Sequence, residues 1–545
     1  MHRADLARGR AAAGVRPEAR GRVARLLHAA TGTFDGMAEP KPRVRLIFVA
    51  LMLVLLLAAL DQTIVSTALP TIVGDLGGIS HLSWVVTAYL LSSTVTGPLY
   101  GKLGDLYGRK KVLQAAIVIF LCGSVLCGLA QSMLQLILFR ALQGLGAGGL
   151  MVVTLAVVGD IIPPRERGRY QGFFGAVFGV ATVVGPLLGG FFVDNLSWRW
   201  IFYVNLPVGA IALSVIAAAF HTRTTTTRHA IDYLGAALLA GSLAAVVLFT
   251  SLGGTTWAWS SPKIVALIVV SVVLLPLFIL VESRAAEPIL PLSLFRNHTF
   301  AVTSAIGFIV GFALFGAVTY LPLYLQVTKG SSPTVSGLQL TPLMAGVLVT
   351  SIVSGQLISR LGRYRMFPIA GTALVAVAMF LLSRLEAGTA TWVAAVFAAI
   401  LGLGLGMVMQ VLVLAVQNSV SPSVMGVATS GSTLFRQIGG SIGVSLFGTI
   451  FASREHVELA KRLPAGAHTP KTVNPAVIKH LPAQAHAAFA DAFAAALHPV
   501  FLTAAGISLV AFALTWLLRE VPLRVRQPGP GEAVEPQRSA EAARA

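Results

Sequence analysis

Apolar residues gather in long runs that short polar segments separate, and this pattern recurs along most of the chain. Each run holds about 18 or more residues with almost no charge, and a helix of that length crosses a bilayer core of about 30 Å. The pattern therefore predicts an all-α polytopic membrane protein. The fourteen predicted spans are 46–69, 83–101, 112–130, 134–158, 169–192, 200–219, 232–252, 263–281, 300–325, 336–358, 366–383, 391–416, 427–450 and 499–518.

The composition agrees with this class. Of the 545 residues, 56% are hydrophobic and only 11% are charged, and the mean hydropathy is +0.81. A soluble core does not use this much apolar surface. Cys122 and Cys127 lie five residues apart in one apolar run and point in different directions on a helix, which argues against a disulfide. The eleven histidines show no metal-ligand spacing, so we expect no metal site.

The basic residues indicate the orientation. The formal net charge is +19, but the arginines fall at the ends of apolar runs and not on a soluble module, so the charge predicts no binding of nucleic acid. With the N-terminus in the cytoplasm, the short outer loops hold few basic residues, which is the positive-inside pattern, and segment 452–498 is the exception. We expect a multi-pass protein of a bacterial cytoplasmic (inner) membrane with both termini cytoplasmic.

The chain also repeats itself. "GKLGDLYGRKK" at 101–111 matches "GQLISRLGRYR" at 355–365, and a glycine-rich stretch at 144–168 matches 402–426 at nearly the same offset. Two six-span halves with a central site are typical of secondary transporters. The expected domains are a basic cytoplasmic tail (1–44), an N-terminal six-helix bundle (45–222), two inserted helices (223–298), a C-terminal six-helix bundle (299–518) with an extracytoplasmic loop (452–498), and a cytoplasmic tail (519–545). Translation from Met37 instead of Met1 is an open alternative.

Four motifs in order carry a resemblance to a known family. They are "LDQTIVSTALP" (60–70), "GKLGDLYGRKK" (101–111), "RALQGLGAGG" (140–149) and "GPLLGG" (185–190). The chain resembles the major facilitator superfamily, specifically its fourteen-span drug:proton antiporter branch. The resemblance implies two six-helix bundles plus two linking helices. It also implies a multidrug exporter that the proton gradient drives without a cofactor. No phosphate-binding loop of the GxxxxGK[ST] type occurs, so no ATP site is expected.

The loop 101–111 is expected to connect the halves. Its glycines permit a tight turn, and Asp105 can face the positive end of a neighbouring helix. By resemblance, Asp105 and Arg109 form a conformational latch with Asp160. The alternative is a solvated loop that only fixes topology. The predicted latch residues are Asp105, Arg109, Asp160, Gly101 and Gly108.

The motif at 185–190 is read in two ways. Pro186 removes a helix hydrogen bond, and Gly185, Gly189 and Gly190 let helices approach closely. In the family this motif marks antiporters and implies export. A pure packing role is the alternative.

Charges inside spans are expensive and so mark functional sites. Asp160, Asp232 and Glu282 lie at span ends, where we expect water to reach them, whereas Asp61 and Arg140 lie well inside. Asp61 is about 22 Å from the inner boundary and Arg140 is about 21 Å from it, so the two depths coincide. We predict that they pair.

The predicted pair suggests proton coupling. Arg140 favours the ionised form of Asp61 when the two are close, and their separation favours protonation. Asp61 is then the proton carrier, in competition with substrate. A static buried ion pair and a snorkelling arginine are the alternatives.

Further residues are candidates for the substrate cavity. Arg436 lies inside span 427–450 without a nominated acidic partner, and it would face the cavity or bind helix-end carbonyls. Aromatic residues of span 300–325 would line an apolar substrate cavity. The alternative is that they face lipid or pack within the protein. The cavity candidates are Gln62, Gln143, Tyr320, Tyr324, Gln326 and Arg436.

The leading function is a proton-coupled exporter of amphipathic or cationic small molecules, working by alternating access as a monomer in the lipid bilayer. The alternatives within transport are a dedicated exporter of one endogenous metabolite, antibiotic, siderophore or lipid, and a proton-coupled uptake symporter. A membrane enzyme lacks a catalytic cluster, and a sensor lacks an output domain, so neither class is favoured.

Overall fold

The computed structural model describes residues 42–76, 82–220, 232–254, 257–462 and 483–523. Its contacts divide the chain into residues 1–46 and 47–545, and nearly all of the described residues belong to the second unit. The predicted tails 1–44 and 519–545, and with them the choice between Met1 and Met37, lie almost wholly outside the described residues.

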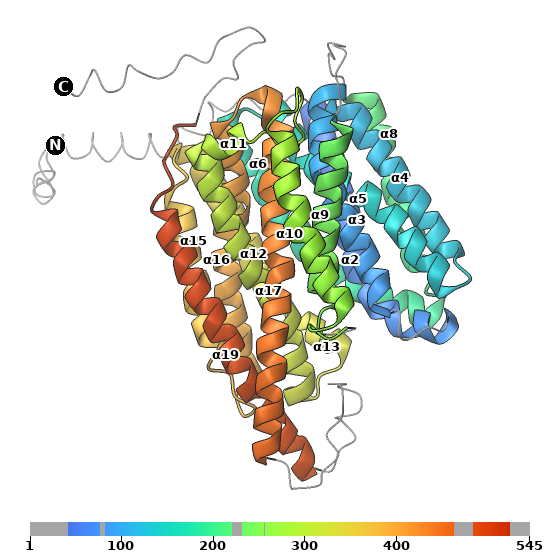
Figure 1. Cartoon of the computed structure of the whole chain (residues 1–545), viewed down its shortest axis with the longest axis vertical. Helices are drawn as coiled ribbons and strands as arrows, with labels where there is room; N and C mark the ends of the chain where they lie inside the picture. The colour runs from blue at the N-terminus through green and yellow to red at the C-terminus, as the bar shows by residue number, and fades with distance from the viewer. Residues whose placement is uncertain (1–41, 77–81, 221–231, 255–256, 463–482, 524–545) are drawn as a thin grey trace, which may run out of the picture. The chain divides into compact units, whose positions relative to one another are not determined.

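Helices make up both repeated halves (Figure 1). The first half comprises α2 (Pro42–Leu76), α3 (Leu82–Tyr107), α4 (Arg109–Leu129), α5 (Met133–Ile161), α6 (Pro164–Asn195), α7 (Trp200–Tyr203) and α8 (Asn205–Ala219). The inserted segment holds α9 (Tyr233–Leu252), α10 (Pro262–Glu282) and the short α11 (Ser293–Arg296). The second half comprises α12 (His298–Lys329), α13 (Pro333–Leu338), α14 (Thr341–Leu361), α15 (Met366–Leu382), α16 (Thr391–Ser419), η2 (Pro422–Val424), α17 (Met425–Arg462) and α19 (Ala483–Thr515).

Every predicted span is helical, although 200–219 is divided between α7 and α8, and 336–358 between α13 and α14. Among the described residues, 12 helices are long and apolar enough to cross a membrane. Of the remaining two predicted spans, 366–383 corresponds to α15, an apolar helix shorter than these, and 83–101 lies within α3.

The predicted loop 452–498 is wrong in extent. The helix α17 continues to Arg462, and α19 already begins at Ala483. In α19, Phe489, Phe493 and Leu497 are buried at four-residue spacing. An amphipathic helical segment therefore precedes the apolar run 499–518. Residues 463–482 lie outside the described residues.

The glycines of the internal repeat make equivalent contacts in the two halves. A Cβ at Gly144 would meet α3 and one at Gly146 would meet α4, while the aligned Gly402 faces α14 and Gly404 faces α15. The helices α5 and α16 are therefore corresponding central helices, each packed between two neighbours through positions where only a hydrogen fits.

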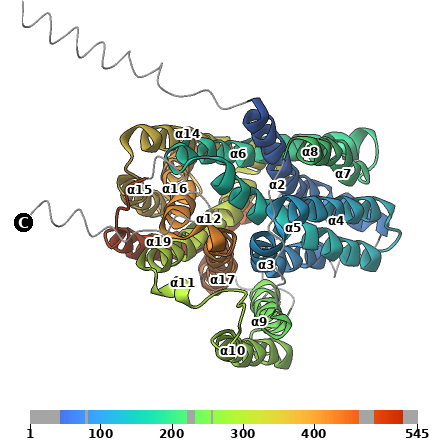
Figure 2. The same cartoon turned by 90° about the horizontal axis from the view of Figure 1, so that it is seen from above.

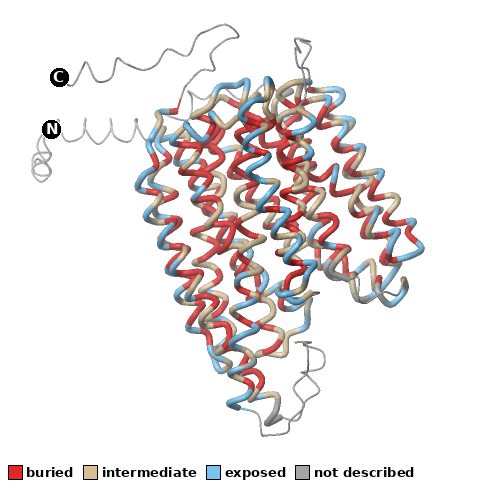
Figure 3. Tube along the Cα trace, in the orientation of Figure 1, coloured by how far each residue is buried: buried red, intermediate tan, exposed pale blue. Residues whose placement is uncertain are grey.

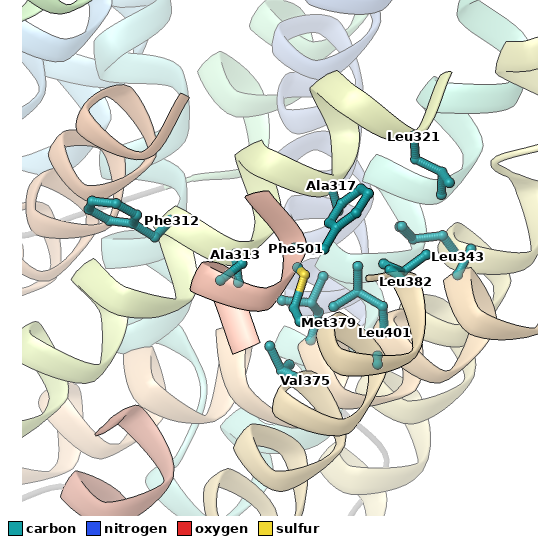
Figure 4. Packing of buried hydrophobic residues seen from close by; sticks show 14 of the residues in the cluster. Phe312, Ala313, Ala317, Leu321, Leu343, Val375, Met379, Leu382, Leu401 and Phe501 are labelled. Atoms are coloured by element: carbon teal, nitrogen blue, oxygen red, sulfur yellow. The ribbon is translucent and has the colours of Figure 1, made fainter. Parts of the chain in front are cut away.

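Apolar side chains fill the second half. Phe312, Met379, Leu401 and Phe501 come from α12, α15, α16 and α19 and pack into one cluster (Figure 4). Buried residues follow the inward faces of the helices in Figure 3. Such tight packing limits motion within a half, so that large changes fall between halves.

The inserted pair lies to one side of the two halves, beside α3 and α17 (Figure 2). The helix α9 contacts both of these helices, and α10 packs mainly on α9. Only 17% of the apolar window of α10 is buried, so most of this helix is available to lipid.

Candidate functional site

A buried ion pair lies within the first half. The Nη1 of Arg140, on α5, donates to Oδ2 of Asp61, on α2, at 2.6 Å. Asp61 is fully buried, and Arg140 is 2% exposed. The structure therefore brings together the two span-interior charges that the sequence paired by depth.

Amides complete the hydrogen bonds of this carboxylate. Gln143, one turn from Arg140, donates to Oδ1 of Asp61 at 2.8 Å. Asn205, at the start of α8, donates to the same oxygen at 3.1 Å. Ser124, on α4, accepts from both amides, at 3.2 Å and 3.0 Å. Four helices thus converge on one carboxylate, and polar partners offset the cost of burying its charge.

Aromatic rings enclose the guanidinium. Its Cζ lies 4.1 Å from the centroid of the Tyr89 ring and 5.9 Å from that of Phe202. These rings keep water out and attract the cation through their π faces. The site therefore holds the carboxylate of Asp61 against a cation that is itself buried.

Sequence reasoning missed part of this site. Asn205 and Ser124 were not singled out, and neither was Tyr89. The available signal was a lone amide or hydroxyl inside an apolar run, which is weak because such groups also bond to their own helix. The predicted neighbour Gln62 is exposed, in contrast to Asp61.

The cavity candidates of α12 contact other parts of the second half. Tyr320 and Tyr324 are buried in the apolar cluster of the second half. The Tyr324 hydroxyl donates to the carbonyl of Glu386 at 2.8 Å, and Gln326 donates to Ser336 at 2.9 Å. The two tyrosine rings thus pack inside the second half, which is the alternative role considered for them, whereas Gln326 is half-buried.

Arg436, on α17, is half-buried. Its backbone packs closely on Gly311 of α12. No ion pair joins its guanidinium to a carboxylate in the part of the chain that the structure describes. The Arg436 guanidinium is thus partly removed from solvent, and no carboxylate of the described residues compensates its charge.

Arg109 gathers two carboxylates at one end of the bundle, here called the Asp105 end. It lies 3.0 Å from Asp105, at the end of α3, and 2.9 Å from Asp160, at the end of α5. It also donates to the carbonyl of Ala156. Gly108, which precedes α4, has φ of 88°, a value that L residues rarely adopt. The turn places Arg109 between α3 and α5.

Asp105 also reaches the other half. Its carboxylate accepts from the backbone N–H of Gly426 at 3.1 Å and of Val427 at 3.0 Å, at the N-terminal end of α17. A Cβ at Gly101 would lie 2.8 Å from the Gly426 carbonyl, so glycine permits this approach. Burial raises the pKa of Asp105, although Arg109 and the two N–H donors oppose this.

Other polar contacts join the halves at the same end. Gln171, on α6, donates to Gln417, on α16, at 2.9 Å. Gln417 in turn donates to the carbonyl of Leu155, on α5, at 3.1 Å. Sequence reasoning did not single out this pair. With Asp105, these residues join the two halves at the Asp105 end.

The motif at 185–190 packs on α2 at Thr63. A Cβ at Gly185 would come within 2.7 Å of the Thr63 Cβ, and Thr63 follows Asp61 by two residues. The Thr63 hydroxyl donates to the carbonyl of Ala181 at 2.9 Å. Gly189 is buried, whereas Gly190 has no atom near its Cβ position. Pro186 faces Gly337 of α13.

A cavity of about 670 Å³ lies away from this site. It opens between the α15–α16 connection, α17 and α19, and its lining includes Arg384, Glu386, Asp491 and His498. Its lining residues all belong to the second half. In the described residues, no group of three His, Cys, Asp or Glu side chains could hold a metal ion.

Comparison with known proteins identifies the relatives. A family model described as Major Facilitator Superfamily matches residues 51–444. An uncharacterised MFS-type transporter of Mycobacterium tuberculosis is 47% identical over 88% of this chain and 70% of its own length. The multidrug transporter protein MdtP of Bacillus subtilis is 42% identical, covering 77% of each chain. Multidrug resistance protein 3 of the same species is 37% identical over 76% of this chain and 81% of its own length.

Two solved structures share the fold. The human organic anion transporter MFSD10 aligns with a TM-score of 0.61 over 87% of this chain and 100% of that one. The proton:xylose symporter XylE aligns with a TM-score of 0.58 over 88% and 97%. Each is 15% identical in sequence, so this likeness concerns the fold alone.

Proposed function

We propose that this chain, which belongs to the Major Facilitator Superfamily, is a proton-coupled exporter of amphipathic or cationic small molecules. The indicated class is multidrug efflux by alternating access. Relatives named as multidrug transporters support the efflux part. The proposed setting is a bacterial cytoplasmic membrane, with the Asp105 end and both termini cytoplasmic and the protein a monomer.

The buried pair of Asp61 and Arg140 carries the proposal. A carboxylate of this depth is stable as an anion only while Arg140 and the amides donate to it. When substrate or a helix movement draws Arg140 away, the carboxylate becomes costly and takes up a proton. Proton and substrate thus exclude each other at one site, which is the requirement for antiport.

The contacts at the Asp105 end supply the conformational half of the cycle. Asp105, Gln171 and Gln417 join the two halves there, so substrate in this state would reach the site from the opposite end. Breaking these contacts would open the cytoplasmic side. The closely packed halves would then move as units.

The test is substrate accumulation in inverted membrane vesicles under an imposed pH gradient. Asp61→Asn is expected to abolish gradient-driven accumulation while leaving exchange of labelled for unlabelled substrate intact, because only the proton carrier is lost. Asp75→Asn is the matched control on the same helix, since an amide oxygen can still accept from Trp198. Full accumulation by Asp61→Asn would refute the assignment.

Arg436 favours a second candidate, a dedicated exporter of one acidic product. A half-buried guanidinium without a carboxylate partner among the described residues would bind a substrate carboxylate or phosphate. Arg436→Gln would then abolish transport of acidic compounds and spare cationic dyes. Equal loss for both classes would exclude this candidate.

A further inference from the structure

Two carboxylates outside the Asp61 site each leave one oxygen buried without a hydrogen-bond partner among the described residues. They are Oδ2 of Asp232, just before α9, and Oε2 of Glu282, the last residue of α10. The expectation that water reaches both at span ends is wrong for Glu282, which is 3% exposed. The chain folds back after α10 and covers it.

The second oxygen of each carboxylate is occupied. Oδ1 of Asp232 accepts from the backbone N–H of Gly235 at 2.8 Å and so caps α9. Oε1 of Glu282 accepts from the backbone N–H of Leu290 at 2.5 Å. The backbone N–H of Ile289 also donates to the Glu282 carboxylate. Each carboxylate is therefore fixed in direction by backbone donors, and its remaining oxygen has a defined position.

The two bare oxygens face the same glycine. Oδ2 of Asp232 lies 2.3 Å, and Oε2 of Glu282 lies 2.9 Å, from the position that a Cβ on Gly235 would occupy, so the two oxygens are at most 5.2 Å apart. A side chain at residue 235 would separate them, so glycine leaves the space in which the two carboxylates meet.

Two negative charges this close, with buried oxygens, repel strongly. A single proton removes one charge and supplies the donor that both oxygens lack. The charges that act on Glu282 are those of Asp232 and of Lys102, on α3. Lys102 forms no ion pair with either carboxylate in the described part of the chain, so it does not replace the missing donor.

We propose that Asp232 and Glu282 hold one proton between them and form a second protonation site, separate from Asp61. The acid of one donates to the bare oxygen of the other. This bond fastens the start of α9 to the end of α10, near Lys102 of α3. The site goes beyond the proposed function, because it binds a proton that takes no part in the Asp61–Arg140 exchange.

The test is the pH dependence of reversible unfolding of the purified full-length protein in detergent micelles. A proton bound by the folded state and released on unfolding makes stability fall as pH rises through the folded-state pKa. The pH window runs from the ordinary carboxyl pKa of about 4 in the unfolded chain up to the higher pKa of the shared proton in the folded protein. Within this window, the folded-to-unfolded ratio of the wild type is expected to fall about tenfold more per pH unit than that of Glu282→Gln. The glutamine amide donates permanently to Asp232, so this variant is expected to fold.

Two more variants make the result specific. Asp232→Asn should reduce the pH dependence of stability in the same pH range. Gly235→Ala should do so without changing any charge, because its methyl group separates the two oxygens. Glu386→Gln, which removes an exposed carboxylate elsewhere, should keep the wild-type profile. Asp61 is unchanged in all these proteins, so any contribution from it cancels in the comparison.

Parallel pH profiles of the wild type and Glu282→Gln would overturn the proposal. Stabilisation of the wild type alone by added Na⁺ or Mg²⁺ at alkaline pH would also overturn it, in favour of a cation site. Neither outcome bears on the vesicle test of Asp61.

Discussion

Asp105 accepts a 3.0 Å hydrogen bond from the backbone N–H of Val427, although 322 residues separate the two. The contact places a negative charge at the N-terminal end of α17, where the helix dipole is positive. It joins the half that contains the ion pair to the half that does not. A charge near the end of α3 thereby contributes to a contact between the two halves.

Asp105→Asn should weaken closure of the Asp105 end. Asparagine keeps one acceptor oxygen but loses the charge. A charge-assisted hydrogen bond is worth about 1–3 kcal/mol, so we expect the equilibrium between the closed and the open Asp105 end to shift about tenfold toward the open state. The measurement is the rate of maleimide labelling of a Ser430→Cys variant from which the native cysteines have been removed. Ser430 is buried at this contact, so labelling requires that the contact opens. Asp105→Glu is the charge-conserving control. Unchanged labelling in Asp105→Asn would show that the contact does not hold the end closed.

Gly172→Ala should open the same end by a steric route. A Cβ there would lie 2.5 Å from the Ser351 carbonyl of α14, so α6 and α14 must separate. The cysteine at position 430 should again label faster. Gly179→Ala, on the same helix, is the matched control, because its Cβ would meet Met344 at an ordinary 3.5 Å. If the two variants label alike, the close approach at residue 172 is not a constraint.

Gly185→Ala should impair both stability and transport. The methyl group would press on Thr63 beside Asp61, and overpacking of this kind costs about 1–3 kcal/mol. Thermal unfolding in detergent and dye efflux measure the two effects. Gly190→Ala, in the same motif, should be neutral, because nothing lies within 4 Å of its Cβ position. A neutral Gly185→Ala would remove the packing explanation of the motif.

Asn205→Ala should slow gradient-driven transport and lower stability. The variant removes one hydrogen-bond donor from Oδ1 of the buried Asp61, and a lost hydrogen bond to a charged group costs about 1.5–3 kcal/mol. Initial rates of gradient-driven efflux and thermal unfolding in detergent measure the two effects. Ser197→Ala, a polar deletion in the short connection before α7, is the control. A wild-type rate and unfolding temperature in Asn205→Ala would show that this hydrogen bond does not support the site.

Much of the fold was readable from the sequence. Hydrophobic run length located the helices, since a bilayer sets the same length for every span. The repeat paired Gly108 with Gly362, and both adopt positive φ, 88° and 70°, in the turn after their helix. These features are local, so the order of residues contains them. The end of α17 and the start of α19 were predicted wrongly, because each helix extends beyond its apolar run as an amphipathic segment.

The site was readable only in part. Asp61 and Arg140 stood out because charge inside a span is costly, and depth along two helices is a one-dimensional quantity. By contrast, helix rotation and the partners on other helices are three-dimensional. The roles of Asn205 and Ser124 at Asp61, the packing of Tyr324 and the meeting of Asp232 with Glu282 depend on which faces turn toward each other. The sequence determined which helices exist and which charges need a partner, whereas tertiary packing alone decided which partner each charge obtained.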